Sequence, residues 1–404
     1  MSTRPSGSDL PRGFAFAAAA CGLKKSGLDL GLLVSEVPAA AAAVFTTNRV
    51  LAAPVIASRF HLQQSRRKMR GIIVNSGNAN CCTGSDGMMA ARTIARKVAW
   101  ELARLDPSQV LVCSTGVIGV PLRWKNIVNA VRPLVRSRRA SAAAFAQFTR
   151  AIMTTDTRPK WAAAKCTIGG TQVRLLGCAK GSGMIQPNMA TMLSFIATDA
   201  SFSPALLQRA LRRAVAPTFN SITVDGDTST NDTLAILANG ASGAKKITRE
   251  NADYKKLCAA LDSVCRSLAL AVVADGEGAQ RVIEIAVRGA PSDRAAEKIA
   301  RTIANSPLVK TALAGADPNW GRILAAAGRS SIPFDFKRAD IRLAGMAVCR
   351  SGREHPFDEL VAHRKMLAKY VPIVVDLHAG RGSSRIWTCD FTGEYVDINS
   401  SYRT

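Results

Sequence analysis

Residues 180–193 read KGSGMIQPNMATML and combine features that rarely occur together. Two glycines give a pliable loop, Pro187 stiffens the chain before a bend, and a strand is expected to begin at Thr191 behind the small Ala190. This order suits a strained peptide bond that is attacked by its own neighbour. If the Thr191 hydroxyl attacks the Ala190 carbonyl, the amide becomes an ester, and hydrolysis frees Thr191 as a new N-terminus.

Such a cleavage would solve a chemical problem for a catalytic threonine. A threonine hydroxyl is a weak nucleophile without a base, and the amide nitrogen of an internal residue cannot accept a proton. After cleavage that nitrogen is an amine with a reference pKa of about 8. Thr191 would then supply both nucleophile and base, which predicts acyl transfer without a catalytic histidine. A threonine that merely opens a buried strand explains the pattern equally well.

Other common catalytic motifs are absent from the sequence. There is no GxSxG elbow, no Walker A loop and no complete GxGxxG. The four histidines, none of them spaced as a metal pair, are His61, His355, His363 and His378. Residues 225–232 resemble a calcium loop but lack its required glycine and glutamate, so a hydrogen-bonded turn is expected instead. No metal site is expected, and the ten cysteines, without a CxxC pair, are expected to be reduced.

Composition limits the class of protein. The 404 residues are 48% hydrophobic and 21% charged, and no apolar run is long enough to span a bilayer. Without a recognisable secretion signal, a cytoplasmic protein with no membrane partner is expected. The net charge of +25 includes two clusters of basic residues, Arg66, Arg67, Lys68 and Arg70, and Arg132, Arg136, Arg138 and Arg139. Neither has interleaved aromatics or a nucleic-acid motif, so a solvated surface is favoured over nucleic-acid binding.

Helices and strands are mixed throughout the chain, which points to a layered α/β or α+β fold. Strands at 71–74 and 110–113 run into small polar loops at 75–80 and 114–119, where a backbone can approach a ligand closely. The pattern further predicts strands at 192–198, 221–224 and 234–237, helices at about 88–105, 204–215 and 257–274, and paired strands within 386–395 around a Gly393 turn. Residues 306–313 and 321–327 flank a tight segment at 315–320. Ser203 and Pro204 look like the cap and first residue of a helix.

Several motifs follow one another in an order that resembles the ornithine acetyltransferase (ArgJ) family over nearly the whole chain. Besides residues 180–193 they are residues 22–29, 45–49, 75–80, 114–119, 153–157, 275–278, 315–322 and 399–404. The resemblance implies an α/β fold, a layered N-terminal-nucleophile-like sandwich of the ornithine acetyltransferase/DmpA type. It also implies self-cleavage between Ala190 and Thr191 into an alpha chain of residues 1–190 and a beta chain of residues 191–404. The high positive charge is not expected from the family.

The resemblance implies an activity in arginine biosynthesis. Members of the family move acetyl from N2-acetyl-L-ornithine to L-glutamate through an acetyl-enzyme, here acetyl-Thr191, as a heterotetramer of two alpha and two beta chains. No cofactor is expected, and whether acetyl-CoA is also a donor stays open. A self-processing amidase or aminopeptidase, in which water takes the acyl group, is the alternative enzyme. A basic nucleic-acid-binding protein is the alternative outside enzymes.

Site residues follow from the same resemblance. Thr191 carries the acetyl group, and Thr115 and Gly116 match the oxyanion hole, whose donors stabilise the tetrahedral oxygen. Positions that match substrate contacts are Thr154, Lys180, Thr191, Glu277, Asn399 and Thr404. The charge of Lys180 suits the α-carboxylate of a substrate, and that of Glu277 suits the ornithine ammonium.

Overall fold

A computed structural model describes residues 5–186 and 192–400 of the chain. The chain forms two compact units, each made of several segments. The first comprises Met1–Gly181, Pro187–Asn220 and Thr228–Ala269, and the second comprises Ser182–Gln186, Ser221–Asp227 and Leu270–Thr404. The sequence predicts a division of the chain between residues 190 and 191 by cleavage. These compact units do not test that division, which stays a prediction.

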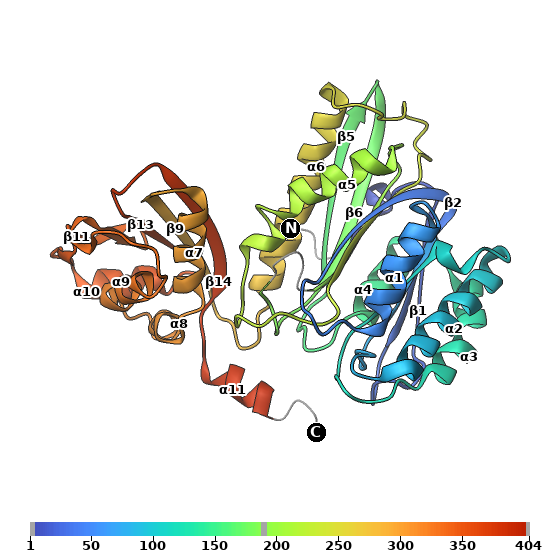
Figure 1. The fold of residues 1–404 in the computed structure, drawn as a ribbon, viewed down its shortest axis with the longest axis horizontal. Coiled ribbons are helices and arrows are strands. Elements are labelled where there is room, and N and C mark those ends of the chain that lie inside the picture. Colours follow the sequence, from blue (N-terminus) through green and yellow to red (C-terminus); the bar gives the residue numbers. More distant parts are fainter. Residues whose placement is uncertain (1–4, 187–191, 401–404) are drawn as a thin grey trace. The chain divides into compact units, whose positions relative to one another are not determined.

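The first unit is built on a sheet of eight strands among the described residues (Figure 1). Its strand order is β4-β3-β2-β8-β7-β6-β5, with β1 also paired to β2. The strands are β1 (Phe14–Ala19), β2 (Leu30–Phe45), β3 (Lys68–Asn75), β4 (Val110–Ser114), β5 (Lys160–Ile168), β6 (Thr171–Lys180), β7 (Leu193–Thr198) and β8 (Thr233–Ala238). β7 and β8 pair in parallel and are buried along their whole length, which explains their continuous apolar sequences.

Helices cover this sheet and close its core. They are α1 (Ala53–Gln64), α2 (Gly84–Ala103), α3 (Trp124–Ser137), α4 (Ala142–Ala151), α5 (Pro204–Val215) and α6 (Ala252–Val273), with short 3-10 turns at Gly7–Asp9 and Pro107–Gln109. Phe148 of α4 packs against Phe16 of β1 and Phe195 of β7, with ring centroids 5.9 and 6.1 Å away. One aromatic side chain therefore joins strands from distant parts of the sequence.

The second unit has a smaller sheet, of six strands in the order β12-β11-β10-β13-β9-β14 in the part of the chain that is described. They are β9 (Val282–Ala290), β10 (Asp340–Leu343), β11 (Met346–Arg350), β12 (Arg353–Glu354), β13 (Tyr370–Asp376) and β14 (Gly382–Cys389). Its helices are α7 (Asp293–Ala304), α8 (Pro307–Ala314), α9 (Trp320–Gly328), α10 (Glu359–Met366) and α11 (Gly393–Ser400), with a 3-10 turn at Phe336–Arg338. A further 3-10 turn, Phe219–Ser221, lies where the chain passes from the first unit into the second. α7 lies against β9 and β14. Within the described residues of both units, every helix is too short or too polar to cross a membrane.

The layered α/β architecture confirms the expectation from the sequence, but two local predictions are wrong. Residues 221–224 form no strand, because Ile222 makes only an isolated bridge to Trp387. Residues 386–395 form no pair of strands either: β14 pairs with β9, and the chain then enters α11. Phe391 and Tyr395 stack with ring centroids 4.5 Å apart, which favours a helical turn over a hairpin here.

The start of α5 agrees with the sequence in position but differs in its cap. Pro204 is the first residue of the helix, as predicted. The Ser203 side chain forms no cap hydrogen bond; instead its backbone N–H donates to the Ile247 carbonyl at 3.0 Å. A long-range backbone contact therefore fixes this helix start.

Replacing Phe148 by alanine should lower the free energy of unfolding by about 3–5 kcal/mol, because its fully buried ring fills the space between α4, β1 and β7. The matched control is Phe60→Ala on α1, where the ring is 54% exposed and a change within about 0.5 kcal/mol is expected. Urea unfolding of both variants measures the difference, and similar losses would contradict this core assignment.

Candidate active site

The first unit brings Lys180 and Thr115 into direct contact. Lys180 is the last residue of β6 and pairs with Leu193 of β7, and Thr115 directly follows β4. The Lys180 Nζ donates to the Thr115 Oγ1 at 3.0 Å, and both side chains are buried. The Lys180 ammonium is thus fixed beside the Thr115–Gly116 turn, so the structure brings together three residues that the sequence had assigned separate roles.

The turn at Gly116 requires glycine for two reasons. Its φ is +132°, a conformation that side chains disfavour, and a Cβ there would lie 2.3 Å from the Gly77 carbonyl carbon and 2.5 Å from the Asn78 nitrogen. The loop of residues 75–80 therefore packs directly against the turn. The Gly116 N–H has no acceptor among the described residues. An unused backbone donor beside a lysine suits the stabilisation of a developing oxyanion.

Asp156 anchors the loops around this turn. Its Oδ1 accepts from the Lys160 Nζ at 2.5 Å and from the Gly181 N–H at 2.7 Å, and its Oδ2 accepts from the Thr154 N–H at 2.9 Å. Burial by itself would raise the pKa of Asp156, but the charges of Lys160 and Lys180 and the Gly181 hydrogen bond lower it to about 2. The ionised carboxylate therefore holds Thr154 and the start of the glycine loop in place.

The residues before β8 complete this part of the site. The Asn231 Nδ2 donates to the carbonyls of Ala79 and Ser114, at 2.6 and 2.9 Å, and so joins two loops that the sequence singled out. Asp232 is buried, and its Oδ2 has no hydrogen-bond partner among the described residues. Burial raises the pKa of Asp232 well above its ordinary value, although the charge of Lys180 acts in the opposite direction.

Three of the predicted site residues, Ala190, Thr191 and Thr404, lie outside the described residues. The chain is described again from Met192, whose carbonyl accepts from the Thr233 N–H at 3.0 Å. The strand expected from residue 192 is present as β7.

The second unit brings Glu277 and Asn399 together. Glu277 is buried, its N–H donates to the Ser182 carbonyl at 2.9 Å, and its Oε2 accepts from the Asn399 Nδ2 at 2.7 Å. A Cβ on Gly183 would lie 2.4 Å from that Oε2, so only glycine leaves room for the carboxylate. Helix α11 places Asn399 at this position, so the structure brings together two of the residues predicted to contact substrate.

Asp225 holds the next part of the glycine loop within the same unit. Its carboxylate accepts from the N–H groups of Met184 and Ile185, at 2.5 and 2.8 Å, and from that of Asp227 at 3.2 Å. Burial raises the pKa of Asp225 in spite of these hydrogen bonds. A hydrogen-bonded turn is thus present at Asp225 and Asp227, as predicted for residues 225–232, and the Asp225 carboxylate binds the glycine loop.

The sequence did not single out three carboxyl groups, those of the buried Asp156 and Asp232 and of the half-buried Asp225. Each lies inside a stretch that the sequence marked, residues 153–157 or 225–232, but a motif does not show which of its residues is buried. Throughout the described ranges, His, Cys, Asp and Glu side chains form no group of three that could hold a metal ion. The ten cysteines are free thiols.

Comparisons with known proteins agree with the motifs. The model of the ArgJ family matches residues 15–404. The arginine biosynthesis bifunctional protein ArgJ of Thermotoga neapolitana is 47% identical over 399 residues, which cover 98% of this chain and 100% of that protein. The protein of the same name from Symbiobacterium thermophilum is 46% identical over 397 residues, 98% of each chain. A crystal structure of the Bacillus halodurans ArgJ protein has 42% identity and a TM-score of 0.51, over 52% of this chain and 100% of that one.

Asp156→Asn should lower the free energy of unfolding by about 3–5 kcal/mol at neutral pH, because the Lys160 ammonium is then buried against a neutral amide. The folded-state pKa of about 2 lies below the ordinary value of 3.8, so the wild-type carboxylate stabilises the fold above pH 4. This advantage is lost as the pH falls from about 4 towards 2, where the two proteins should converge.

The matched control for this pair is Asp9→Asn, since Asp9 meets Lys165 in a more exposed ion pair, at 3.2 Å. A loss below about 1 kcal/mol is expected there. Chemical unfolding at several pH values measures both variants. A cost for Asp156→Asn no larger than the control's would show that the carboxylate is not the anchor of these loops.

Proposed function

The chain belongs to the ArgJ family, and we propose that it is an acyltransferase of arginine biosynthesis that moves acetyl from N2-acetyl-L-ornithine to L-glutamate. The products are L-ornithine and N-acetyl-L-glutamate. The observation that carries this proposal is the Lys180–Thr115 contact beside the unused Gly116 N–H, in a chain whose relatives are named arginine biosynthesis bifunctional proteins. Transfer of an acetyl group between two amino acids needs a cation that binds their carboxylates and a hydrogen-bond donor for the oxyanion.

The first proposed step is self-cleavage between Ala190 and Thr191. The Thr191 hydroxyl oxygen bonds to the Ala190 carbonyl carbon, the C–N bond breaks, and the nitrogen takes up the hydroxyl proton. Water then hydrolyses the ester, leaving a carboxylate on residues 1–190 and an amine on residues 191–404. The family membership and the order of residues in the glycine loop support this step. A heterotetramer of two alpha and two beta chains is the assembly proposed for the product.

Acetyl transfer then follows a two-step route. The Thr191 hydroxyl attacks the acetyl carbonyl of N-acetylornithine while its own amine accepts the proton, and ornithine leaves after its α-nitrogen is protonated. Glutamate attacks the resulting ester through its α-amine and restores Thr191. Thr115 and the Gly116 N–H are proposed to donate to the oxyanion in both steps, and losing one such donor typically costs about 10²-fold in rate.

Substrate recognition is proposed to use opposite charges and polar side chains. Lys180 suits the α-carboxylate that both substrates carry, and Glu277 suits the side-chain ammonium of ornithine. Thr154, Asn399 and Thr404 complete the proposed contacts to amide and carboxylate oxygens. Because the substrates share the α-amino acid group, the same residue, Lys180, can contact the carboxylate of each in turn.

Purified protein should separate into fragments of residues 1–190 and 191–404, and N-acetylornithine alone should leave an acetyl mass on the second. Added glutamate should remove that mass, because its amine accepts the acetyl group. Intact-mass spectrometry measures both results. Thr191→Ala should stay uncut and unlabelled, whereas Thr191→Ser keeps the hydroxyl required for cleavage.

Three outcomes would change this assignment. A fully active, uncut chain would refute the processing step. Release of free acetate without transfer to glutamate would identify the amidase alternative instead. Intersecting initial-rate lines with no label on Thr191 would refute the acetyl-enzyme. Repeating the labelling with acetyl-CoA decides whether the enzyme also takes acetyl from a second donor.

Glu277→Gln should raise the KM for N-acetylornithine roughly tenfold or more, because a hydrogen bond to a charged group is lost. The thermal midpoint should change little, since glutamine keeps the shape and can still accept from Asn399. Glu394→Gln, an exposed position at the start of α11, is the matched control and should leave both values unchanged. A fall in stability that parallels the loss of activity would make Glu277 a structural residue.

A further inference from the structure

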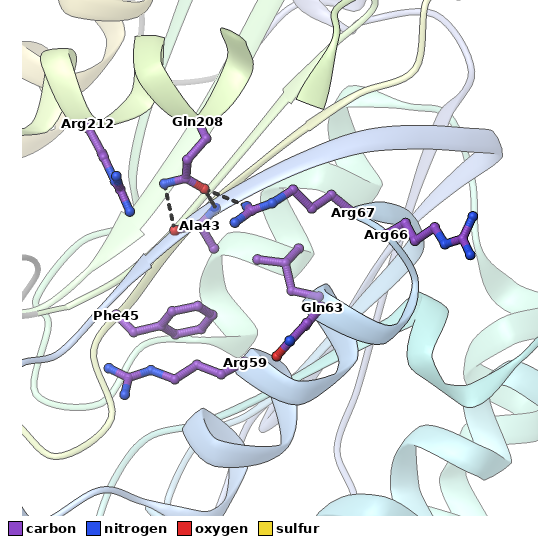
Figure 2. A pocket seen from close by; sticks show the side chains of 9 residues that line it. Ala43, Phe45, Arg59, Gln63, Arg66, Arg67, Gln208 and Arg212 are labelled. Atoms are coloured by element: carbon purple, nitrogen blue, oxygen red, sulfur yellow. Dashed lines mark hydrogen bonds between the residues drawn. The ribbon is translucent and has the colours of Figure 1, made fainter. Parts of the chain in front are cut away.

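A hollow of about 580 Å³ lies in the first unit between α1, α5 and the end of β2 (Figure 2). Four arginines, Arg59, Arg66, Arg67 and Arg212, contribute to its lining, and we call it the arginine hollow. The Arg66 guanidinium points away from the other three (Figure 2). Phe45 and Gln208 contribute to its walls. None of the residues proposed for acetyl transfer lines it, so its chemistry needs a separate explanation.

No carboxylate lines the arginine hollow, and none of its four arginines forms an ion pair within the described residues. The neighbouring arginines of α5 behave differently: Arg209 pairs with Glu250 and Arg213 with Asp262. Arg212 therefore lies between two neutralised arginines and faces other cations. Burial, together with the positive charge of Arg212, lowers the pKa of Arg67. The hollow concentrates positive charge that the protein itself does not balance.

The backbone places Arg66 and Arg67 at the end of α1. Their N–H groups donate back to the carbonyls of Gln63 and Leu62, at 3.0 and 2.9 Å. Both residues have positive φ, 50° and 60°, which non-glycine residues rarely adopt. The partial negative charge of a helix C-terminus offsets some of their repulsion, but Arg59 and Arg212 come from other positions. A helix cap therefore does not account for the presence of Arg59, Arg67 and Arg212 around one hollow.

Gln208 fixes the floor of the arginine hollow. Its side-chain amide is buried and exchanges two hydrogen bonds with the Ala43 backbone, at 3.1 and 3.2 Å. Its Oε1 also accepts from the Arg67 Nη1 at 2.7 Å, so one guanidinium edge is held while the others stay available (Figure 2). Arg59 is similarly held by the Thr46 carbonyl at 2.7 Å and lies over the Phe45 ring. The guanidinium groups of Arg59 and Arg67 are thus held in position before any ligand binds.

We propose that the arginine hollow binds a small molecule that carries two or more phosphate groups. A phosphate group carries about −1.5 to −2 charges near neutral pH, so two of them balance the guanidinium groups of Arg59, Arg67 and Arg212. The planar guanidinium matches phosphate oxygens in pairs. The volume is in the range of small-molecule sites, and Phe45 offers an apolar wall for the remainder of the ligand. This site goes beyond acetyl transfer, since neither N-acetylornithine nor glutamate carries phosphate.

Calorimetric titration of the full-length protein with inorganic tripolyphosphate and with ATP tests the proposal. Saturable binding of tripolyphosphate is expected, and it should weaken as salt rises, because the contacts are partly exposed ion pairs. Tighter binding of ATP would identify a nucleotide, and equal binding would identify the phosphate chain alone as the recognised group. Either result supports the site.

Arg212→Gln should weaken binding about tenfold or more, because it removes a charged donor. Arg213→Gln, the next residue of the same helix, removes the same charge but belongs to the Asp262 pair and should leave binding unchanged. Arg67→Lys keeps the charge and loses the planar fork, so it too should weaken binding. Arg212 is exposed, so its variant is expected to fold, and unchanged acetyl transfer without phosphate confirms that.

Four results would overturn the proposal. One is the absence of saturable binding at low salt. Another is equal weakening by Arg212→Gln and Arg213→Gln, which would show only a general effect of net charge. Citrate that binds as tightly as tripolyphosphate would remove the preference for phosphate. Displacement of ATP by a single-stranded oligonucleotide at far lower concentration would assign the hollow to nucleic acid instead.

Discussion

The Asp156 carboxylate, buried against Lys160 and close to the charge of Lys180, is the contact on which the first unit's site depends. A buried ion is costly unless its remaining lone pairs are also satisfied, and here two backbone N–H groups do this. Those N–H groups belong to Gly181 and Thr154, so the balance of charge also sets the path of two loops. The same arrangement also fixes the position of Lys180, because Lys180 directly precedes Gly181 in the chain and donates a hydrogen bond to Thr115.

Carboxylates hold the rest of the glycine loop by the same means. Asp225 accepts from two consecutive backbone N–H groups, and the Glu277 backbone donates to Ser182, while Gly183 leaves room for the Glu277 side chain. Glycine thus serves here for close approach, and the acidic side chains supply the rigidity that a glycine-rich segment lacks. A loop that the sequence describes as pliable is fixed through its main-chain donors.

The sequence predicted the parts of the fold that depend on local pattern. The apolar runs of β7 and β8 and the proline at the start of α5 were sufficient signals. Residues 221–224 and 386–395 were wrong because their structure depends on distant partners, such as the isolated bridge from Ile222 to Trp387. For the candidate site, the motifs singled out Thr115, Gly116 and Lys180, and the structure shows Lys180 in contact with Thr115. They did not identify Asp156 or Asp232, since burial and the loss of hydrogen-bond partners arise only when separate strands come together.

The sheet of the first unit interleaves strands from both sides of the Ala190–Thr191 bond. β7, which follows that bond, lies between β6, which precedes it, and β8, and β8 in turn pairs with β2 from the N-terminal part. Cutting the bond would therefore leave every inter-strand hydrogen bond in place, and the two products would remain entwined. Folding would, however, become a different kind of reaction after cleavage. The uncut chain folds as a single molecule, whereas two separated fragments must first bind each other. The covalent link between the fragments would therefore assist only the first folding of the enzyme. After cleavage, the lifetime of the folded enzyme would depend on how slowly it unfolds.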